Sequence, residues 1–405
     1  MSTTKKFLTI ILVGLVLWVL SIITLHPGTA GAQSDENNQT NQSYLALNKK
    51  GLELLNSGMY NESLGYFDKA LAVSPDNARI LDNKGFALYS LGNLSGALHY
   101  YDKALAIEPN YTTASNDKEL ALLKVGNQLL KSGSYSDAIG YYDRALAINA
   151  SNPHALNNKG FALYSLGNYS GAIPYYDRSL AIEPNDPVTL NNKGLAVYYS
   201  GNYSGALPYY DRALAINPNY TDALVDKAVA LGQLGNYSEA LPVLDKALVL
   251  DPNDLVGLNT KGLALESLGR YSEAITIFDK LLALQPNDTT TLIDKAFILH
   301  KAGKNDESIT YLDRALALKP NSTTALNNKG VVLLETGKND EAITYFDKVL
   351  ALNLKDVESL NGKGVALANL HNYYEANKYF DKALAIDPGY GPALRSKQKI
   401  LDFLK

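Results

Sequence analysis

The residue types that most often carry out catalysis are scarce in this sequence and lie in no catalytic spacing. There is no cysteine, which excludes a disulfide framework, a thiolate zinc site and a cysteine nucleophile. The five histidines are His26, His99, His154, His300 and His371. No two of them stand three or four residues apart, and no G-x-S-x-G, H-E-x-x-H or glycine-rich phosphate loop occurs. We therefore predict no metal and no cofactor.

One carboxylate recurs instead. Ten aspartates follow one another along the chain, from Asp68, Asp102 and Asp143 to Asp381, and each precedes a lysine or an arginine. An active site needs such a carboxylate once, so a carboxylate used ten times indicates architecture. We predict that the protein is not an enzyme.

Length and charge narrow the class further. The chain has 405 residues, 46% of them hydrophobic, and a formal net charge of −4, which is typical of soluble globular proteins but too long for one ordinary core. Without the first 32 residues, 35 basic residues stand against 41 acidic ones. This balance argues against nucleic acid as a partner.

The N-terminus is typical of an export signal. Lys5 and Lys6 precede an apolar run over residues 7–25, and a small-residue stretch ends at Ala32. Residues 1–32 are a cleaved signal peptide or, because the run is long enough to cross a bilayer, a signal anchor; a buried globular helix is a third reading. The first two place the chain from residue 33 onward outside the cytoplasm, with residues 33–43 as an unstructured polar spacer.

Asparagine sequons are numerous, which fits export. They start at Asn38, Asn41, Asn61, Asn93, Asn110, Asn149, Asn168, Asn202, Asn219, Asn236, Asn287 and Asn321. One interpretation is N-glycosylation. The other is turn chemistry that was copied with the surrounding sequence.

A repeated unit fills residues 44–390. A small residue recurs every 34 residues, with one interval of 41, at Gly51, Gly85, Gly126, Gly160, Gly194, Ala228, Gly262, Ala296, Gly330 and Gly364. Leucine precedes it by four residues and apolar residues follow it by three, which is a helical stripe. A glycine turn and a second apolar stripe come next. The sequence thus predicts ten helical hairpins that bury their stripes by stacking.

This pattern resembles the tetratricopeptide repeat (TPR) family. The residues that carry the resemblance are, in one unit, Gly160, the turn Gly167-Asn168-Tyr169, Ala172, Ser179 and Pro184. The resemblance implies an all-α solenoid, a right-handed superhelix of helix pairs with a concave groove.

Three features depart from a regular array. His371 replaces a turn glycine, Leu354 a closing proline and Val349 a later alanine, so we expect looser packing in the last two units. Seven extra residues lie near residues 111–117, as two added helical turns or as a protruding loop. Residues 391–405 read as a capping helix, with four apolar residues facing inward: Leu394, Ile400, Leu401 and Leu404.

Lysine precedes the small residue in nine of the ten units, for example Lys50, Lys84 and Lys159. Since an aspartate recurs on each second helix, we predict Lys–Asp pairs between adjacent helices. Such pairs orient helices more than they stabilise them, because desolvation offsets much of the Coulomb attraction.

The resemblance also places a candidate ligand groove on the first helices. Its members are Asn83, Phe86, Tyr89, Lys124, Asn127, Asn158, Phe161, Tyr164, Asn192, Tyr198 and Tyr199. Asparagine can hydrogen-bond an extended peptide's main chain without reading its side chains, and the rings offer apolar area. We expect the strongest groove between units two and five, although Phe297 and Asn328 repeat parts of the pattern later. The alternative is that the asparagines only solvate a groove wall and the rings fill packing gaps.

These observations favour a non-catalytic extracytoplasmic scaffold that binds proteins or extended peptides. Two other classes stay open, namely a membrane-tethered assembly factor and a glycan-binding or structural envelope protein. Self-association along the solenoid is a further alternative.

Overall fold

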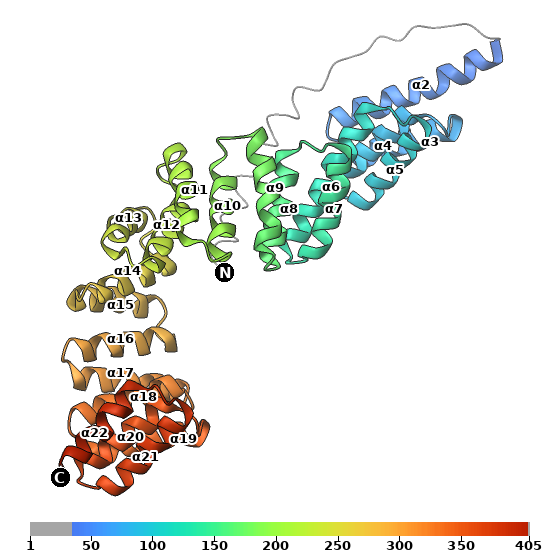
Figure 1. The fold of residues 1–405 in the computed structure, drawn as a ribbon. Coiled ribbons are helices and arrows are strands. Elements are labelled where there is room, and N and C mark those ends of the chain that lie inside the picture. The colour runs from blue at the N-terminus through green and yellow to red at the C-terminus, as the bar shows by residue number, and fades with distance from the viewer. Residues whose placement is uncertain (1–34, 404–405) are drawn as a thin grey trace. The chain divides into compact units, whose positions relative to one another are not determined.

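The computed structural model describes residues 35–403, which form helices joined by short turns (Figure 1). In chain order they are α2 (Asp35–Asn56), α3 (Tyr60–Val73), α4 (Ala78–Ser90), α5 (Leu94–Ile107), α6 (Thr112–Lys131), α7 (Tyr135–Ile148), α8 (Pro153–Ser165), α9 (Tyr169–Ile182), α10 (Pro187–Tyr199), α11 (Tyr203–Ile216), α12 (Thr221–Gln233), α13 (Tyr237–Leu250), α14 (Leu255–Ser267), α15 (Tyr271–Leu284), α16 (Thr289–Lys301), α17 (Asn305–Leu318), α18 (Thr323–Glu335), α19 (Asn339–Leu352), α20 (Val357–Asn369), α21 (Tyr373–Ile386) and α22 (Gly391–Phe403). This described part contains no strand, which confirms the all-α class.

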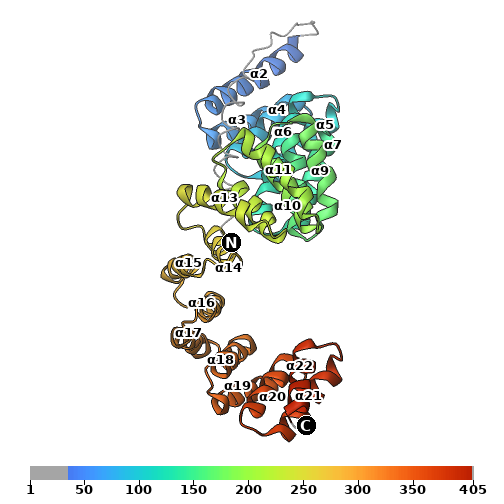
Figure 2. The same cartoon turned by 60° about the vertical axis from the view of Figure 1, so that its left-hand side comes forward.

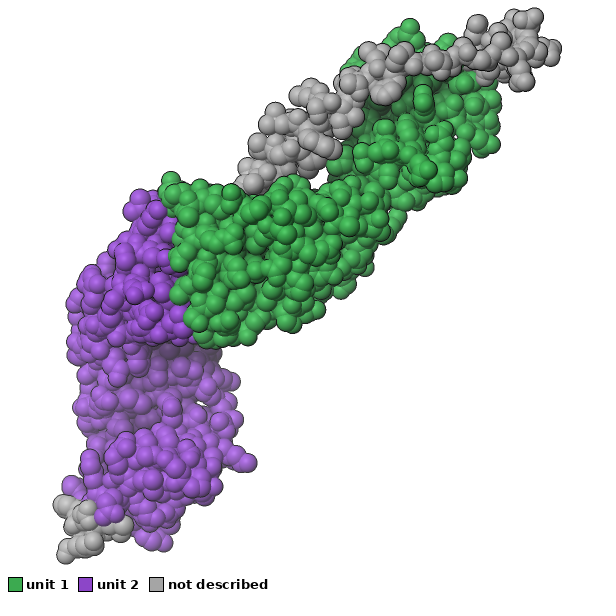
Figure 3. Space-filling model, turned by 45° about the horizontal axis from the view of Figure 1, so that its top comes forward, with its two compact units in different colours: residues 1–223 green, residues 224–405 purple. Residues whose placement is uncertain are grey.

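Consecutive helices form pairs, as in α4 with α5 and α20 with α21 (Figures 1 and 2). The even-numbered member is called the first helix of each pair, and the odd-numbered member the second. The chain divides into two compact units (Figure 3). Unit 1 comprises residues 1–223 and unit 2 comprises residues 224–405. Within each unit, a first helix contacts the next first helix, as α4 does α6 and α18 does α20.

Local capping explains where the helices begin and end. Asn152 accepts a hydrogen bond from the Ala155 amide at the start of α8, and Asp288 accepts one from Thr291 at the start of α16. Between the helices of each pair, a glycine with positive φ, such as Gly167 (φ 80°), ends the first helix. In the last pair His371 takes that conformation (φ 63°). The turn chemistry read from the sequence therefore holds even where glycine is missing.

In the core of most helix pairs, an aromatic ring packs against a glycine, in the space that a side chain would fill. A Cβ atom on Gly160 would lie 2.7 Å from Cε1 of Tyr176, which is fully buried. Eight repeats combine the small glycine with a tyrosine or phenylalanine sixteen residues later. In the other two repeats Ala228 and Ala296 have Leu244 and Leu312 at that spacing. The small residue is alanine only where the facing side chain is a leucine.

The seven extra residues lengthen α6 into a helix of 20 residues, against 13 for α4 and α8. They add two helical turns, so both ends of α6 keep their faces in register. At one end Lys118 pairs with Asp102 of α5 (2.7 Å), and at the other Gly126 packs on Tyr142 of α7. The insertion is therefore helical and no loop protrudes there.

The Lys–Asp prediction is confirmed. Most of these lysines reach an aspartate sixteen residues earlier on the preceding second helix, as Lys261 does Asp245 and Lys363 does Asp347, both at 2.5 Å. The same pairing joins Lys84, Lys159, Lys193, Lys295 and Lys329 to their aspartates. Lys118 and Lys397 extend the series beyond the residues named from the sequence. Lys50, in the first pair, contacts Glu53 instead.

The ends of the chain need two corrections. Helix α2 begins at Asp35, so residues 35–43 are helical and not an unstructured spacer. Helix α22 packs on α20 and α21, with Ile400 buried but Leu394 exposed, because Ala393 takes the inward place. Residues 1–32, predicted as the export segment, and the side chains of Leu401 and Leu404 lie outside the described part.

Candidate functional site

The asparagines named from the sequence form a ladder that joins first helices of unit 1. Asn83 donates to Oδ1 of Asn48 (3.0 Å) and Asn192 donates to Oδ1 of Asn157 (3.0 Å), each pair being 35 residues apart. Asn158 donates to Oδ1 of Asn127 (2.9 Å). Asn192 is only 2% exposed. These amides therefore bind one another and leave few groups for a ligand.

At one place the register positions of the paired asparagines are occupied by carboxyl groups, and Oδ1 of Asp82 is buried there without a hydrogen-bond partner in the described part of the chain. Asp82 of α4 and Asp117 of α6 are 35 residues apart, the spacing of the asparagine pairs. Burial and the charge of Asp117 raise the pKa of Asp82 to about 8. A hydrogen bond from Tyr111 acts in the opposite direction and offsets part of this rise. Burial raises the pKa of Asp117 to about 6. At neutral pH Asp82 thus keeps its proton, and a carboxylic acid stands where the other rungs have an amide.

Buried tyrosine hydroxyls lie beneath the ladder. Tyr142 donates to Oδ1 of Asn127 (2.8 Å). The hydroxyls of Tyr101 and Tyr176 are buried with no partner in the described part of the chain. Burial and the nearby charges of Asp117 and Asp82 raise the pKa of Tyr101. A buried hydroxyl without a hydrogen-bond partner costs folding free energy. Tyr101 and Tyr176 therefore place two unsatisfied polar groups beneath the first helices.

Next to the ladder, six aromatic side chains make one continuous cluster, here called the aromatic patch. Its members are Phe161, Tyr164, Tyr169, Tyr198, Tyr199 and Tyr203. The centroids of Tyr164 and Tyr199 are 5.6 Å apart, and Tyr169 stacks on Tyr199 at 5.3 Å. Tyr199 is 50% exposed, so the patch presents apolar area to solvent.

A smaller group comes from the preceding pairs. Phe86 stacks on Tyr89 with centroids 6.2 Å apart, and Nζ of Lys124 lies 4.2 Å from the centroid of Tyr89. A lysine over a ring is a cation–π contact. The structure therefore divides the predicted groove residues into this group around Tyr89 and the aromatic patch with its asparagines.

Sequence reasoning named four members of the aromatic patch and missed Tyr169 and Tyr203. Both missed residues begin a second helix, α9 and α11, directly after a Gly-Asn turn. The recurring Gly-Asn-Tyr turn was the signal, but it belongs to second helices, whereas the resemblance pointed only to first helices.

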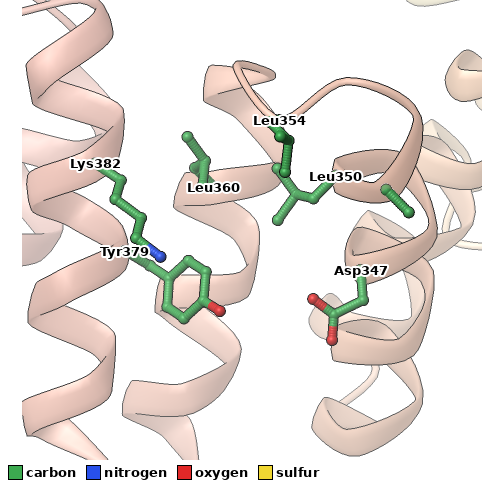
Figure 4. A pocket seen from close by; sticks show the side chains of 7 residues that line it. Asp347, Leu350, Leu354, Leu360, Tyr379 and Lys382 are labelled. Atoms are coloured by element: carbon green, nitrogen blue, oxygen red, sulfur yellow. The ribbon is translucent and has the colours of Figure 1, made fainter.

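Two pockets lie in unit 2. One, of about 470 Å³, is lined by Leu350, Leu354 and Leu360, with Asp347 on one side and with Tyr379 and Lys382 on the other (Figure 4). Leu354, which stands in place of the closing proline, is 80% exposed there, whereas Val349, which stands in place of a later alanine, is fully buried. The other, of about 200 Å³, lies among α16, α18 and α20 and contains Phe297 and Asn328.

Some of the sequon asparagines have a structural task. Asn93, Asn168 and Asn202 each precede a second helix and accept a hydrogen bond from the amide three residues later, at 3.0, 3.0 and 2.9 Å. This is N-cap chemistry. It accounts for the repetition of these sequons without a glycan.

The described residues offer neither a metal site nor a membrane-spanning helix. Within residues 35–403 no cluster of histidine, aspartate or glutamate suits a metal ion. None of the described helices combines the length and the apolarity needed to span a bilayer, and the apolar run over residues 7–25 lies outside that range.

Comparison with known proteins gives the family. Models described as tetratricopeptide repeat match residues 78–111, 123–187, 198–258, 256–288, 287–355 and 332–391. No curated protein matches the sequence.

Three solved structures are among those similar to this chain. A tetratricopeptide repeat protein from Parabacteroides merdae ATCC 43184 is 19% identical, with 62% of this chain and 98% of that chain covered and a TM-score of 0.46. YrrB, described as a TPR protein with an unusual peptide-binding site, is 26% identical (47% and 97% covered, TM-score 0.39). Yeast Tom70 is 18% identical (90% and 89% covered, TM-score 0.43).

The family models together cover well over half of the sequence, and the helix pairs, the glycine–ring packing and the closing turns agree with them. The chain belongs to the tetratricopeptide repeat family.

Proposed function

We propose that the chain is a non-catalytic scaffold that binds extended polypeptides on the first-helix face of unit 1, at the aromatic patch. Tetratricopeptide repeat proteins are generally non-catalytic, and their fold suggests a protein-interaction scaffold. The single observation that carries the proposal is the continuity of the patch. Six rings from four helices touch in series, and the outermost, Tyr199, is half exposed.

The patch supports this role energetically. Apolar area that a docked chain removes from water contributes about 25 cal/mol per Å². Tyrosine rings lose little conformational freedom on binding and keep a hydroxyl for hydrogen bonds, which suits them to peptide contacts. The asparagine ladder, whose amides are already paired, holds α8 and α10 in register below the rings. In this proposal the asparagines position the rings and make no main-chain contacts with the ligand.

The test begins with selection of ligands from a displayed nonapeptide library against the full chain. An enriched peptide is then synthesised and titrated by calorimetry. Tyr164→Ser and Tyr199→Ser are expected to weaken binding at least tenfold. Tyr374→Ser serves as the matched control, because Tyr374 is an exposed tyrosine on α21 outside the patch. Equal loss in the control and the patch variants, or no loss in either, would refute the site.

We further propose that this scaffold works outside the cytoplasm, either released after cleavage following Ala32 or anchored by residues 7–25. Support comes from the basic start, the apolar run and the small residues before Ala32. Intact-mass measurement of the exported protein separates a chain that begins at Gln33 from one that keeps its first 32 residues. The same spectrum shows whether any of the sequons carries a glycan.

The alternatives predict other outcomes of the same experiments. A glycan-binding protein would retain oligosaccharides on an array through the same tyrosines and select no peptide. A membrane-tethered assembly factor would keep residues 1–32 and co-purify with a multiprotein complex.

A further inference from the structure

The smaller pocket of unit 2 is built for a single side chain. Phe297 and His300 line it from α16, Glu335 from α18 and Glu358 from α20. Its volume of about 200 Å³ is below the about 300–1,000 Å³ of sites that enclose a drug-sized ligand. Phe297 is 39% exposed, so one wall is an accessible ring.

Two carboxylates border the pocket with weak partners. Oε2 of Glu335 lies 3.3 Å from Nε2 of His300, and Oε2 of Glu358 accepts a hydrogen bond from Nδ2 of Asn327 (3.1 Å). Within the described residues neither carboxylate forms an ion pair with a lysine or an arginine. The other oxygen of each is left for a further donor.

One histidine and one lysine lie beside the pocket. His300 is 11% exposed and has its other ring nitrogen, Nδ1, 2.8 Å from Oδ1 of Asn305, so its two ring nitrogens are shared between Asn305 and Glu335. Lys301, the one lysine of the pocket, lies over Phe297 with Nζ 5.2 Å from the ring centroid. The ring therefore already attracts a cation.

Other acidic groups gather on the same face. Asp294 lies one turn before Phe297 on α16, and its pKa is raised to about 6 by burial and by the charges of Asp288 and Glu266. The two lysines that precede the small residues of α16 and α18, Lys295 and Lys329, point elsewhere, because they pair with aspartates of second helices. This face therefore has an excess of carboxylates, which is complementary to a cation.

We propose that the pocket among α16, α18 and α20 binds an arginine side chain of an extended polypeptide partner. The guanidinium stacks on Phe297 and donates to Glu335 on one side and Glu358 on the other. Arginine fits better than lysine, because its planar group presents donors in several directions, binds carboxylates with two hydrogen bonds and stacks on rings. The arginine reaches the pocket only within a bound polypeptide, so this site rests on the peptide-binding function proposed above.

The test uses a labelled, acetylated nonapeptide of glycine and serine with one central arginine, titrated into the full chain by fluorescence anisotropy. We expect saturable binding. A citrulline peptide, which keeps the shape and removes the charge, should bind at least tenfold more weakly, and a lysine peptide should fall between the two. No saturation by the arginine peptide up to millimolar concentration, or equal binding of arginine and citrulline, would overturn the proposal.

Protein variants locate the effect. Glu335→Gln and Glu358→Gln keep an acceptor for His300 and Asn327 and remove one charge each, so both should keep their helical content and lose at least tenfold in affinity for the arginine peptide. Glu341→Gln on α19 removes a charge from the same unit outside the pocket and should change affinity less than twofold. Equal losses in all three variants would mean a general charge effect and no arginine site.

The outcome is separable from that of the peptide-binding proposal. Peptides that depend on Tyr199 but not on Glu335 would leave the aromatic patch standing and remove the arginine pocket. Arginine peptides that depend on Glu335 while Tyr164→Ser and Tyr199→Ser have no effect would do the reverse.

Discussion

The first helices of the two units use the same register positions for opposite chemistry. Five residues after the small residue stands Tyr199 in unit 1 and Glu335 in unit 2, and four residues after it stand Tyr164 and His300. The face of unit 1 is aromatic over a ladder of paired amides. The face of unit 2 is acidic around a small pocket. One scaffold therefore carries two surfaces that differ in charge while its helices remain the same.

The core beneath these faces differs in step with them. Four repeats of unit 1 place a tyrosine against the small glycine, for example Tyr142 and Tyr176. The hydroxyl of Tyr142 donates a hydrogen bond to the asparagine ladder. Unit 2 has Phe278, Phe346 and Phe380 at that position, or leucine against alanine. A polar ladder thus coincides with a core that can supply hydroxyls to it. The face and the core of a repeat are physically coupled.

The largest expected effect is on the stability of unit 1, which should depend on pH. Asp82 holds its proton up to a pKa of about 8 in the folded chain, whereas an unfolded aspartate loses it near 3.9. The folded state therefore binds more protons over this range, and stability falls as pH rises, by about 1.4 kcal/mol per pH unit between pH 6 and 8. Hydrogen exchange of α4 and α6 at several pH values measures this.

The substitution Asp82→Asn should flatten the slope of stability against pH. It replaces the carboxyl group with an amide, as in the asparagine pairs, and an amide does not release a proton in this pH range. Asp294→Asn is the matched control in unit 2, where the raised pKa of about 6 confines the effect to lower pH. An unchanged slope above pH 6 in Asp82→Asn would show that this rung does not hold a proton.

Next in size is the coupling of the small residue to the ring. Gly160→Ala places a Cβ atom 2.7 Å from the Tyr176 ring and should cost about 1–3 kcal/mol of unfolding free energy, measured by urea denaturation. Adding Tyr176→Leu copies the Ala228 and Leu244 pair of unit 2 and should recover at least half of that loss. Additive losses in the double variant would separate the two residues.

A smaller effect tests the hydroxyls. Tyr142→Phe removes the bond to Asn127 and should cost about 1 kcal/mol. Phe278→Tyr, the reverse change in unit 2, adds a hydroxyl to a fully buried ring, and the expected cost is of similar or greater size, about 1–3 kcal/mol. Both are read from the urea midpoint. A neutral Phe278→Tyr would mean that unit 2 also accepts a polar core.

Much of the fold follows from the sequence, because each repeat contains the spacing that predicts its helices and the glycine that predicts its turn. The spacing of Gly160 and Leu156 marks a helix face, and Gly167 marks its end. The Lys–Asp pairs were also readable, since both residues recur with every unit. The extent of α2 was not, because the nine polar residues ahead of Tyr44 carry no apolar stripe and become helical only by continuing a helix that packs later.

The site was harder to read. The sequence identified Asn158 and Asn192 as polar groups on first helices, but pairing across 31 and 35 residues depends on the distance between helices, which no single repeat specifies. For the same reason, nothing local indicates that Glu335 and Glu358, on different helices, border one pocket. The ion pair between Lys118 and Asp102 was missed for a different reason, because it can be recognised only once α6 is known to be one continuous helix.

The smallest effect concerns the turns, where unit 2 departs most from the repeat. His371 holds φ at 63°, a left-handed conformation that costs a residue with a Cβ atom about 1–2 kcal/mol relative to glycine. Its Nδ1 lies 2.9 Å from the Tyr373 hydroxyl, which recovers part of that cost. His371→Gly should therefore raise the unfolding free energy of α20 and α21 by up to about 1 kcal/mol, measured by hydrogen exchange. Gly337→His, in the preceding turn of the same unit (φ 78°), should lower stability by about the same amount. If both variants lose stability, the histidine contributes more through its contact with Tyr373 than the backbone strain takes away.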